Sequence, residues 1–181
     1  AQDYLSALNE LGRTATAAEL SAWDIDVRPD FLGLPPGSGS VAQGEALWLD
    51  QCASCHGDFG DSNEVFSPIV LGNITEDDVR TGRVAALTDP SVVRTTFMKV
   101  ATLSTIWDYI NRAMPWNAPK SLAADEVYSL VAYLLNLAYI VDDDFVLSDE
   151  NMAEVQALMP NRNGMTEDHG LWSVNGVPDV V

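Results

Sequence analysis

The residues with the clearest chemistry are Cys52, Cys55 and His56, which form a C-x-x-C-H sequence. Two thiols at this spacing can form thioether bonds to the two vinyl groups of one porphyrin, and the following residue offers an imidazole to the iron. No other common cofactor needs two sulfurs and a nitrogen in this order. The motif therefore predicts one covalent haem c, attached through Cys52 and Cys55, with His56 as an axial iron ligand.

Two other interpretations of the motif explain the surrounding sequence less well. A redox disulfide of the thioredoxin kind normally starts a helix in a βαβ unit, whereas a polar, glycine-containing stretch follows His56 here. A tetrahedral zinc site needs four ligands. The chain contains two Cys and two His, and His169 lies far away in a polar C-terminal stretch. Haem is therefore favoured over both alternatives.

A methionine is the expected ligand on the opposite face of the iron. The candidates, together with His169, are Met98, Met114, Met152, Met159 and Met165. Met114 precedes Pro115, whose ring ends helical structure, so its thioether can project from a helix end. Met114 is the predicted ligand and Met98 the second choice, although any single methionine could instead fill the core.

An iron held by both His56 and Met114 has no position open for a substrate, which favours electron transfer over catalysis. Thioether ligation also raises the reduction potential relative to two imidazoles. Pro68 starts a short apolar run after the motif, and its carbonyl is expected to accept a hydrogen bond from Nδ1 of His56. The predicted cofactor-binding residues are thus Cys52, Cys55, His56, Met114 and Pro68, and no catalytic residue is predicted.

The chain of 181 residues carries 27 acidic and 9 basic side chains, for a net charge of −18. Such a field repels nucleic acid and anionic membranes, so neither is an expected partner, whereas a protein with a basic surface is. The alternative explanation of the acidity is that it only keeps the surface well solvated. The longest apolar stretch, residues 130–140, is interrupted by Asn136. It is too short for a membrane span, which needs about 20 apolar residues.

The expected location follows from the motif rather than from the composition. In most bacteria haem is attached to reduced thiols outside the cytoplasm, so C-x-x-C-H implies export. The chain starts at Ala1 without a charged and then apolar leader, as expected for an exported protein after signal cleavage. We therefore expect a periplasmic protein.

Apolar periodicity predicts an all-α fold built on two longer helices. In residues 41–52, Gly44, Leu47 and Trp48 share one helical face, and the glycine indicates close contact with another helix. Residues 124–137 repeat the pattern and are the expected partner. Shorter helices are expected at residues 4–11, 17–23, 91–98, 104–112 and 149–158.

Capping residues indicate where two of the shorter helices begin. Thr16 and Glu19 fit a capping box for residues 17–23. Ser148 is the expected N-cap of residues 149–158. The stretch between the haem motif and residue 104 has no sustained period apart from the short helix noted above, so loops around a prosthetic group are expected there.

Composition divides the chain into three parts. Residues 1–40 form an N-terminal extension or strap that ends in the Pro- and Gly-rich stretch 34–40. Residues 41–140 form the haem domain. Residues 141–181 form an acidic C-terminal extension, expected to become an irregular tail from Met159 onward.

These features together resemble a class I cytochrome c over residues 41–140. The matching parts are the helix face at Gly44–Trp48, the motif Cys52–His56, Pro68, the Met114-Pro115 pair and the helix of residues 122–135. The resemblance implies an all-α cytochrome domain that transfers single electrons through one haem.

A narrower resemblance covers nearly the whole chain. Its motifs lie in residues 12–41, in Trp107-Asp108-Tyr109-Ile110, in residues 145–151 and in Met159-Pro160-Asn161. They resemble the SoxD cytochrome subunit of sulfane dehydrogenase. Longer members of that family carry a second haem domain, whereas this chain contains a single C-x-x-C-H.

The SoxD resemblance implies a molybdenum-cofactor subunit, SoxC, as the electron donor in periplasmic thiosulfate oxidation, and a small soluble cytochrome as the acceptor. It also implies that the extensions serve as docking straps. The chain would then be the electron-transfer subunit of an oxidoreductase complex rather than its catalytic subunit. A stand-alone electron carrier, or a haem enzyme or gas sensor in which Met114 moves away, are the competing hypotheses.

Overall fold

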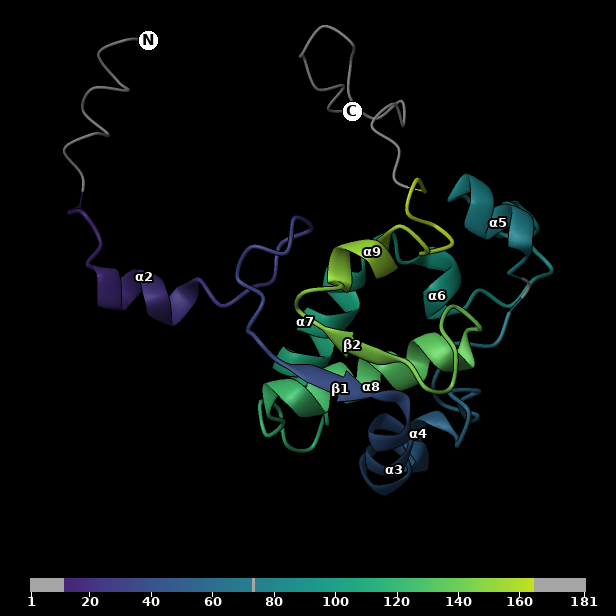
Figure 1. Cartoon of the computed structure of the whole chain (residues 1–181), viewed down its shortest axis with the longest axis horizontal. Helices are drawn as coiled ribbons and strands as arrows, with labels where there is room; N and C mark the ends of the chain where they lie inside the picture. The colour runs from purple at the N-terminus through teal and green to yellow at the C-terminus, as the bar shows by residue number, and fades with distance from the viewer. Residues whose placement is uncertain (1–11, 73, 165–181) are drawn as a thin grey trace, which may run out of the picture.

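Two helices, α3 (Val41–Gln51) and α8 (Ala124–Leu137), pack across each other, with α3 at the lower edge of the body in Figure 1, and we call them the central helices. The structure is a computed structural model and describes residues 12–72 and 74–164. The other elements are α2 (Ala17–Trp23), β1 (Ser38–Ser40), α4 (Ala53–His56), α5 (Glu76–Thr81), η1 (Ala85–Thr88), α6 (Thr96–Lys99), α7 (Leu103–Ala113), β2 (Val146–Ser148) and α9 (Met152–Gln156). The predicted all-α class is confirmed, with one two-stranded sheet added.

Gly44 is the point of closest approach between α3 and α8. A Cβ atom at this position would lie 1.9 Å from the carbonyl oxygen of Ser129 and 2.8 Å from Cβ of Tyr133. Only a residue without a side chain permits that approach. The structure therefore confirms that the mid-helix glycine marks a helix contact.

Helix α8 is the most buried element because it packs against four neighbours, α3, α7, β1 and β2. Its start lacks a capping side chain at Ala123, but the Glu126 carboxylate accepts a hydrogen bond from the Ala123 backbone at 2.7 Å. Leu122 and Val127, on either side of this turn, are both buried. These contacts fix the start of α8 where the sequence predicts it.

Helix α7 connects the N-terminal extension to the core. Its buried Asp108 accepts a hydrogen bond from the backbone of Val27 at 3.3 Å and pairs with Arg112 one turn later. The helix ends at Met114, whose backbone N–H donates to the Ile110 carbonyl at 3.1 Å. The predicted end of this helix before Met114-Pro115 is confirmed.

The small sheet joins two segments that are far apart in the sequence. Strands β1 and β2 pair antiparallel, with Gly39 opposite Leu147. From β2 onward, the side chains of Leu147, Met152, Val155 and Met159 lie in the same hydrophobic core as α8. The division of the chain into three parts remains a prediction, since the core continues past residue 140.

Three local expectations are wrong. No irregular tail begins at Met159, because Met159 is fully buried and Asn161 accepts from the Val84 backbone at 3.3 Å and donates to the Lys99 carbonyl at 3.0 Å. The helix expected at residues 91–98 is shorter and begins at Thr96. Helix α9 begins after Asn151, because Ser148 is taken up by β2.

Helix α5 was not expected, although its signals are present. The Thr75 side chain accepts from the Asp78 backbone, and the Asp78 side chain accepts from the Thr75 backbone at 2.8 Å. Gly82 ends the helix with a left-handed φ of 70°. The helix expected at residues 4–11 lies outside the described residues.

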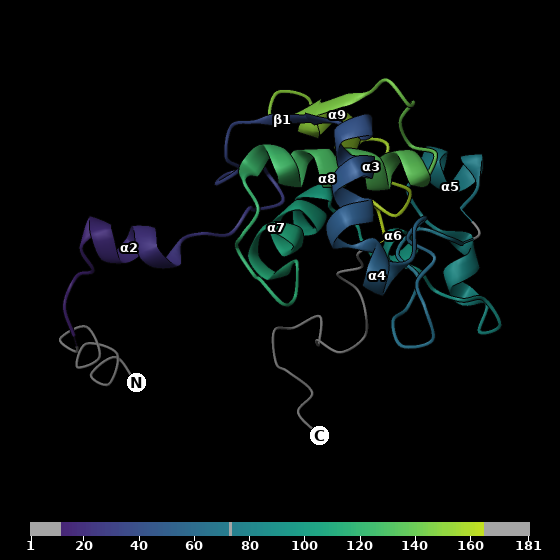
Figure 2. The ribbon, with the colours of Figure 1, turned by 90° about the horizontal axis from the view of Figure 1, so that it is seen from below.

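Helix α2 stands away from the rest of the molecule in both Figure 1 and Figure 2. The predicted capping box of Thr16 and Glu19 is confirmed, yet no residue of the helix is buried. Its large apolar side chains, Leu20 and Trp23, are 57% and 86% exposed. Within the described part of the chain, no helix has the length and apolar character needed to cross a membrane.

Candidate functional site

The two cysteines and His56 lie on a single helical turn. The backbone N–H groups of Cys55 and His56 both donate to the Cys52 carbonyl, at 3.1 and 3.0 Å, and Gly57 donates to Ala53 at 2.8 Å. Positions i, i+3 and i+4 share one face of a helix. Short helix α4 and its N-cap residue Cys52 therefore present two sulfurs and one imidazole to the same side.

The His56 imidazole lies between two aromatic rings. The ring centroids of Trp48 and Phe66 are 5.8 and 5.7 Å from that of His56. Burial among these rings lowers the pKa of His56, so the neutral imidazole that can donate a lone pair to iron predominates at neutral pH. Among the described residues, none forms a hydrogen bond with the buried Nδ1 of His56.

The loop after the motif is fixed by side chains from both central helices. The Trp48 indole on α3 donates to the Gly57 carbonyl at 2.9 Å, and the Tyr133 hydroxyl on α8 donates to the Asp58 carbonyl at 3.0 Å. The Asn63 amide donates to the Cys55 carbonyl at 2.8 Å. These positioning residues were not identified from the sequence, where Trp48 reads only as part of a helix face.

Both cysteines are free thiols, with Cys52 partly buried and Cys55 exposed. Burial, with a smaller contribution from nearby Cys55, raises the pKa of Cys52 to about 11. Two free thiols and a neutral imidazole, all on one helical face, fit a haem c. When bound, that group supplies an iron that gains and loses one electron reversibly.

The hydrogen bond expected between His56 and Pro68 is not formed in the structure. The Pro68 carbonyl instead accepts the Thr96 backbone N–H at 3.3 Å. Thr96 is the first residue of α6, where backbone N–H groups have no partner within the helix. Pro68 is thus used to fix the start of α6, and its contact with a cofactor stays a prediction.

Met114 lies at the end of α7, half-buried and packed against the hydrophobic core. Met98, Met152 and Met159 are fully buried. Met165 and His169 lie outside the described residues. Of the described methionines, Met114 is thus the one that combines partial exposure with a position at a helix end.

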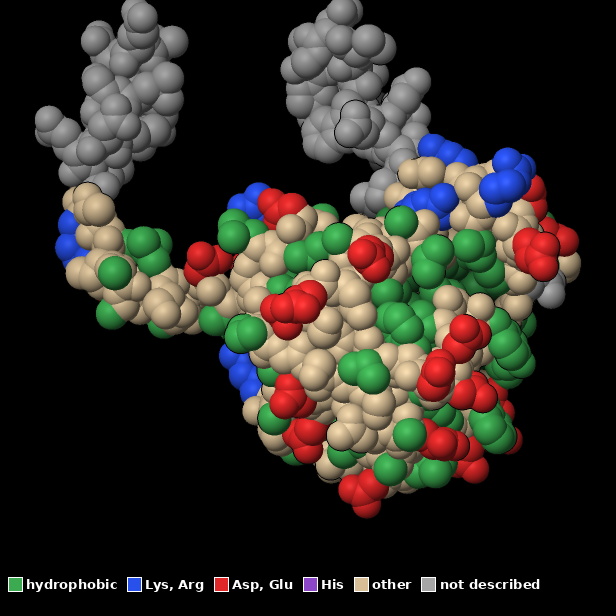
Figure 3. Space-filling model, viewed as in Figure 1, with side chains coloured by type: hydrophobic (Ala, Val, Ile, Leu, Met, Phe, Trp, Pro, Cys, Tyr) green, Lys and Arg blue, Asp and Glu red, His purple; other side chains and the backbone are tan. Residues whose placement is uncertain are grey.

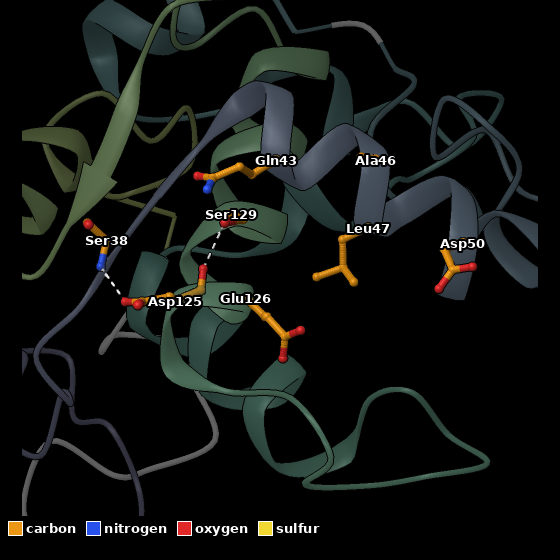
Figure 4. A pocket seen from close by; sticks show the side chains of 8 residues that line it. All are labelled: Ser38, Gln43, Ala46, Leu47, Asp50, Asp125, Glu126 and Ser129. Atoms are coloured by element: carbon orange, nitrogen blue, oxygen red, sulfur yellow. Dashed lines mark hydrogen bonds between the residues drawn. The ribbon is translucent and has the colours of Figure 1, made fainter.

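A hollow of about 630 Å³ lies between α3 and the start of α8 (Figure 4). Most of its polar groups already have partners: Asp125 accepts from the Ser38 backbone at 2.9 Å, and Gln43 accepts from the Ser40 backbone at 3.1 Å. Neither cysteine of the motif lines it. The hollow therefore offers no converging free groups for a small ligand.

Comparison with known proteins agrees with this geometry. The family model described as cytochrome C oxidase, cbb3-type, subunit III matches residues 39–134, which include α3, the haem motif and α8 as far as Leu134. The chain belongs to this family of c-type cytochromes. Its cytochrome c domain is an electron carrier, and membership of the family implies haem c at the Cys52–Cys55 pair.

A solved structure extends the match beyond the cytochrome domain. The crystal structure of the sulfane dehydrogenase SoxCD from Paracoccus pantotrophus contains a chain 41% identical to this one, with a TM-score of 0.72. The match covers 88% of this cytochrome and 72% of that chain. It confirms the resemblance to the SoxD cytochrome seen in the sequence. Among curated proteins, none matches.

Proposed function

We propose that this cytochrome is the electron-accepting subunit of a periplasmic molybdenum sulfane dehydrogenase. In this role it takes single electrons from a SoxC-like subunit and passes them to a small soluble cytochrome. The observation that carries the proposal is the extent of the likeness to the SoxCD chain: it covers 88% of this chain, whereas the cytochrome family model stops at residues 39–134. A free electron carrier has no need of the matched extensions.

The proposed site contains one haem c joined to Cys52 and Cys55, with His56 and Met114 as the axial ligands and Pro68 beside the imidazole. Trp48 and Tyr133 hold the loop that follows His56, through hydrogen bonds of 2.9 and 3.0 Å to the backbone. A rigid loop keeps the imidazole in place in both oxidation states. Small rearrangement on gaining an electron is what a carrier requires.

The N-terminal arm, residues 12–25, supports a docked rather than a free carrier. Its helix α2 buries none of its own residues, while Leu20 and Trp23 expose most of their apolar surface. Exposed aromatic side chains of this kind are typical of the centre of protein interfaces. We propose that the arm lies on the SoxC-like donor.

The test uses the full-length cytochrome with its haem and the SoxC subunit of the Paracoccus pantotrophus relative. We expect a stable complex on size-exclusion chromatography and rapid haem reduction when a sulfane-sulfur substrate is added. A variant carrying Leu20→Ala and Trp23→Ala should lose the complex while keeping its haem spectrum. A cytochrome that never associates with SoxC, yet is reduced by unrelated donors, would instead be a stand-alone carrier.

A further inference from the structure

A second hollow, of about 220 Å³, lies between α5 and the C-terminal end of α8. Most of the residues that line it are apolar: Val70, Leu71, Ile74, Val79, Leu137, Ala138 and Tyr139. Figure 3 shows hydrophobic side chains gathered on this part of the surface, with acidic side chains beside them. Nothing in the electron-carrier site described above uses this hollow.

The backbone conformation at position 139 disfavours a tyrosine. Helix α8 ends in a Schellman motif, in which the Ile140 backbone donates to the Leu135 carbonyl at 2.9 Å and the Tyr139 backbone donates to the Asn136 carbonyl at 2.8 Å. The residue after the cap is then left-handed, with φ of 58° at Tyr139. Glycine or asparagine is the usual residue there, because a larger side chain is strained.

Burial does not explain Tyr139 either, since its side chain is 97% exposed. Leu71, which lines the same hollow, is 54% exposed. Neither local conformation nor the folded core therefore favours a tyrosine at this position. A protein partner that covers the exposed ring would favour a tyrosine here, because tyrosine contributes strongly at the centres of interfaces. We name Leu71, Ile74, Val79, Leu137 and Tyr139 the Tyr139 surface.

Most charges around the Tyr139 surface are acidic, and one basic group, the Arg162 guanidinium, lies against α5, where it donates to the carbonyls of Val79 and Arg80. Glu76 lines the hollow, and Asp142, Asp143 and Asp144 follow two residues after Ile140. The Asn136 amide on the last turn of α8 donates to the Asp143 carboxylate at 2.9 Å, which holds this acidic turn against the helix. The nearby Arg80 is paired with Asp77 at 2.5 Å.

Sequence composition sharpens the charge argument. Residues 121–161, which include α8 and the acidic turn, contain no Lys or Arg. An apolar centre with a negative rim matches a partner that has an apolar centre and a positive rim. A second copy of this chain would instead place carboxylates against carboxylates, which disfavours self-association through this surface.

The surface also lies in a suitable place for electron exit. Figure 1 and Figure 2 show α2 and α5 at opposite ends of the molecule, so a donor on the arm leaves the α5 end free. Val70 in the hollow donates its backbone N–H to Gly60 at 3.4 Å, in the loop that follows His56. The hollow is thus joined directly to the haem-attachment loop.

We propose that the Tyr139 surface is the docking site for the electron acceptor, a soluble redox protein that presents a positively charged face with an apolar centre. This inference rests on the proposed function, because it assigns the second of the two surfaces that an electron-transfer subunit needs.

The test follows electron transfer by stopped-flow spectroscopy from the reduced full-length cytochrome to a soluble cytochrome c of net positive charge, the probe acceptor. Tyr139→Asn suits the left-handed conformation, so it should keep or raise the midpoint of thermal unfolding. We expect it to slow the second-order transfer rate about tenfold, as for loss of one central interface aromatic. Leu71→Asn should slow transfer as well, and high salt should reduce the wild-type rate.

Leu158→Asn is the matched control, because Leu158 is 41% exposed and does not line the hollow. It should transfer electrons at the wild-type rate. Wild-type rates in both Tyr139→Asn and Leu71→Asn would overturn the proposal. So would a wild-type dimer that Tyr139→Asn dissociates without changing the transfer rate, since the surface would then serve self-association.

Failure of the proposed function has a different signature. In that case the SoxC subunit would not reduce the wild-type cytochrome, whatever the acceptor kinetics show. If the Tyr139 surface alone is wrong, SoxC reduces wild type and Tyr139→Asn equally and the probe acceptor does not distinguish them.

Discussion

Helices α2 and α3 begin with the same kind of N-terminal cap, but α2 is exposed and α3 packs into the core. Both have a capping box, formed by Thr16 and Glu19 in α2 and by Ser40 and Gln43 in α3. Yet α2 has no buried residue, whereas α3 buries Val41, Gly44 and Trp48. Capping decides where a helix starts, but a close fit to another element decides whether it joins the core.

The tryptophans of the two helices show the functional side of this difference. Trp48 on α3 is 3% exposed and holds the haem-attachment loop through its indole N–H, whereas Trp23 on α2 is 86% exposed. One ring serves the interior site, and the other is free to meet a partner. The comparison predicts that matched substitutions in α3 affect folding and haem, while those in α2 affect assembly.

The largest expected effect is that of Gly44→Ala. The added Cβ would meet the Ser129 carbonyl oxygen at 1.9 Å, so α3 and α8 would have to move apart. We expect the free energy of unfolding to fall by about 3 kcal/mol, at the upper end of overpacking effects, in chemical denaturation of the haem-loaded protein. The control Ala42→Gly, on the exposed face of α3, should cost about 1 kcal/mol at most. Equal stability of Gly44→Ala and wild type would show that the helices are not in close contact.

Trp48→Phe should have the next largest effect. It removes the 2.9 Å hydrogen bond to the Gly57 carbonyl, at a cost of about 1 to 2 kcal/mol in the free energy of unfolding. The haem absorption spectrum should also change, because this bond holds the loop after His56. Trp23→Phe should leave both the unfolding curve and the spectrum unchanged. A change of similar size in the two variants would remove the distinction between the helices.

Removal of the N-cap side chain should destabilise only the helix itself in α2, but the whole fold in α3. Thr16→Ala and Ser40→Ala each remove a side chain that accepts from a backbone N–H three residues later, worth about 1 kcal/mol. Because α2 packs on no other element of the described structure, loss of the Thr16 cap should appear only as faster amide hydrogen exchange in residues 17–23. The Ser40→Ala loss should appear in global unfolding. Global destabilisation by Thr16→Ala would mean that α2 belongs to the core.

The smallest expected effect is a pH response confined to α2. An ion pair with Arg13 and hydrogen bonds from Thr16 lower the pKa of Glu19, which lies in the first turn of α2, from 4.5 to about 2. The charged carboxylate caps the helix, so this contribution is complete above pH 4.5 and is lost as the pH falls through about 2. The α3 cap uses Gln43, which does not titrate. NMR titration should follow both caps, and a Glu19 that titrates at its ordinary value would contradict the account.

The sequence predicts those helices whose own residues show a cap or a regular spacing of apolar side chains. The ranges of α2, α3, α7 and α8 agree with expectation because caps and apolar spacing are local signals. Strands β1 and β2 could not be anticipated, since three-residue strands have no pattern and their partners lie more than a hundred residues apart. Helix α5 was missed because six residues are too few to show a period, although Thr75 and Gly82 mark its ends.

The candidate site also combines residues that the sequence predicts with residues that only the fold brings together. Cys52, Cys55 and His56 are adjacent in sequence, so their chemistry is readable without a structure. Tyr133 reaches the haem loop from a helix 75 residues beyond Asp58, and no local pattern encodes that hydrogen bond. The sequence predicts a hydrogen bond from His56 to the Pro68 carbonyl, whereas the use of that carbonyl by the Thr96 backbone at the start of α6 could be seen only in the fold.

The most direct test of the account is whether the iron is held by His56 and Met114. Ferric haem with a thioether ligand has a weak long-wavelength charge-transfer band. We predict this band in the wild-type cytochrome and in Met98→Ala, and its loss in Met114→Ala, which should also gain the ability to bind carbon monoxide when reduced. A band that survives in Met114→Ala, or is absent from the wild type, would contradict the assignment of Met114. It would also contradict the account of an electron carrier whose iron has no position open for a substrate.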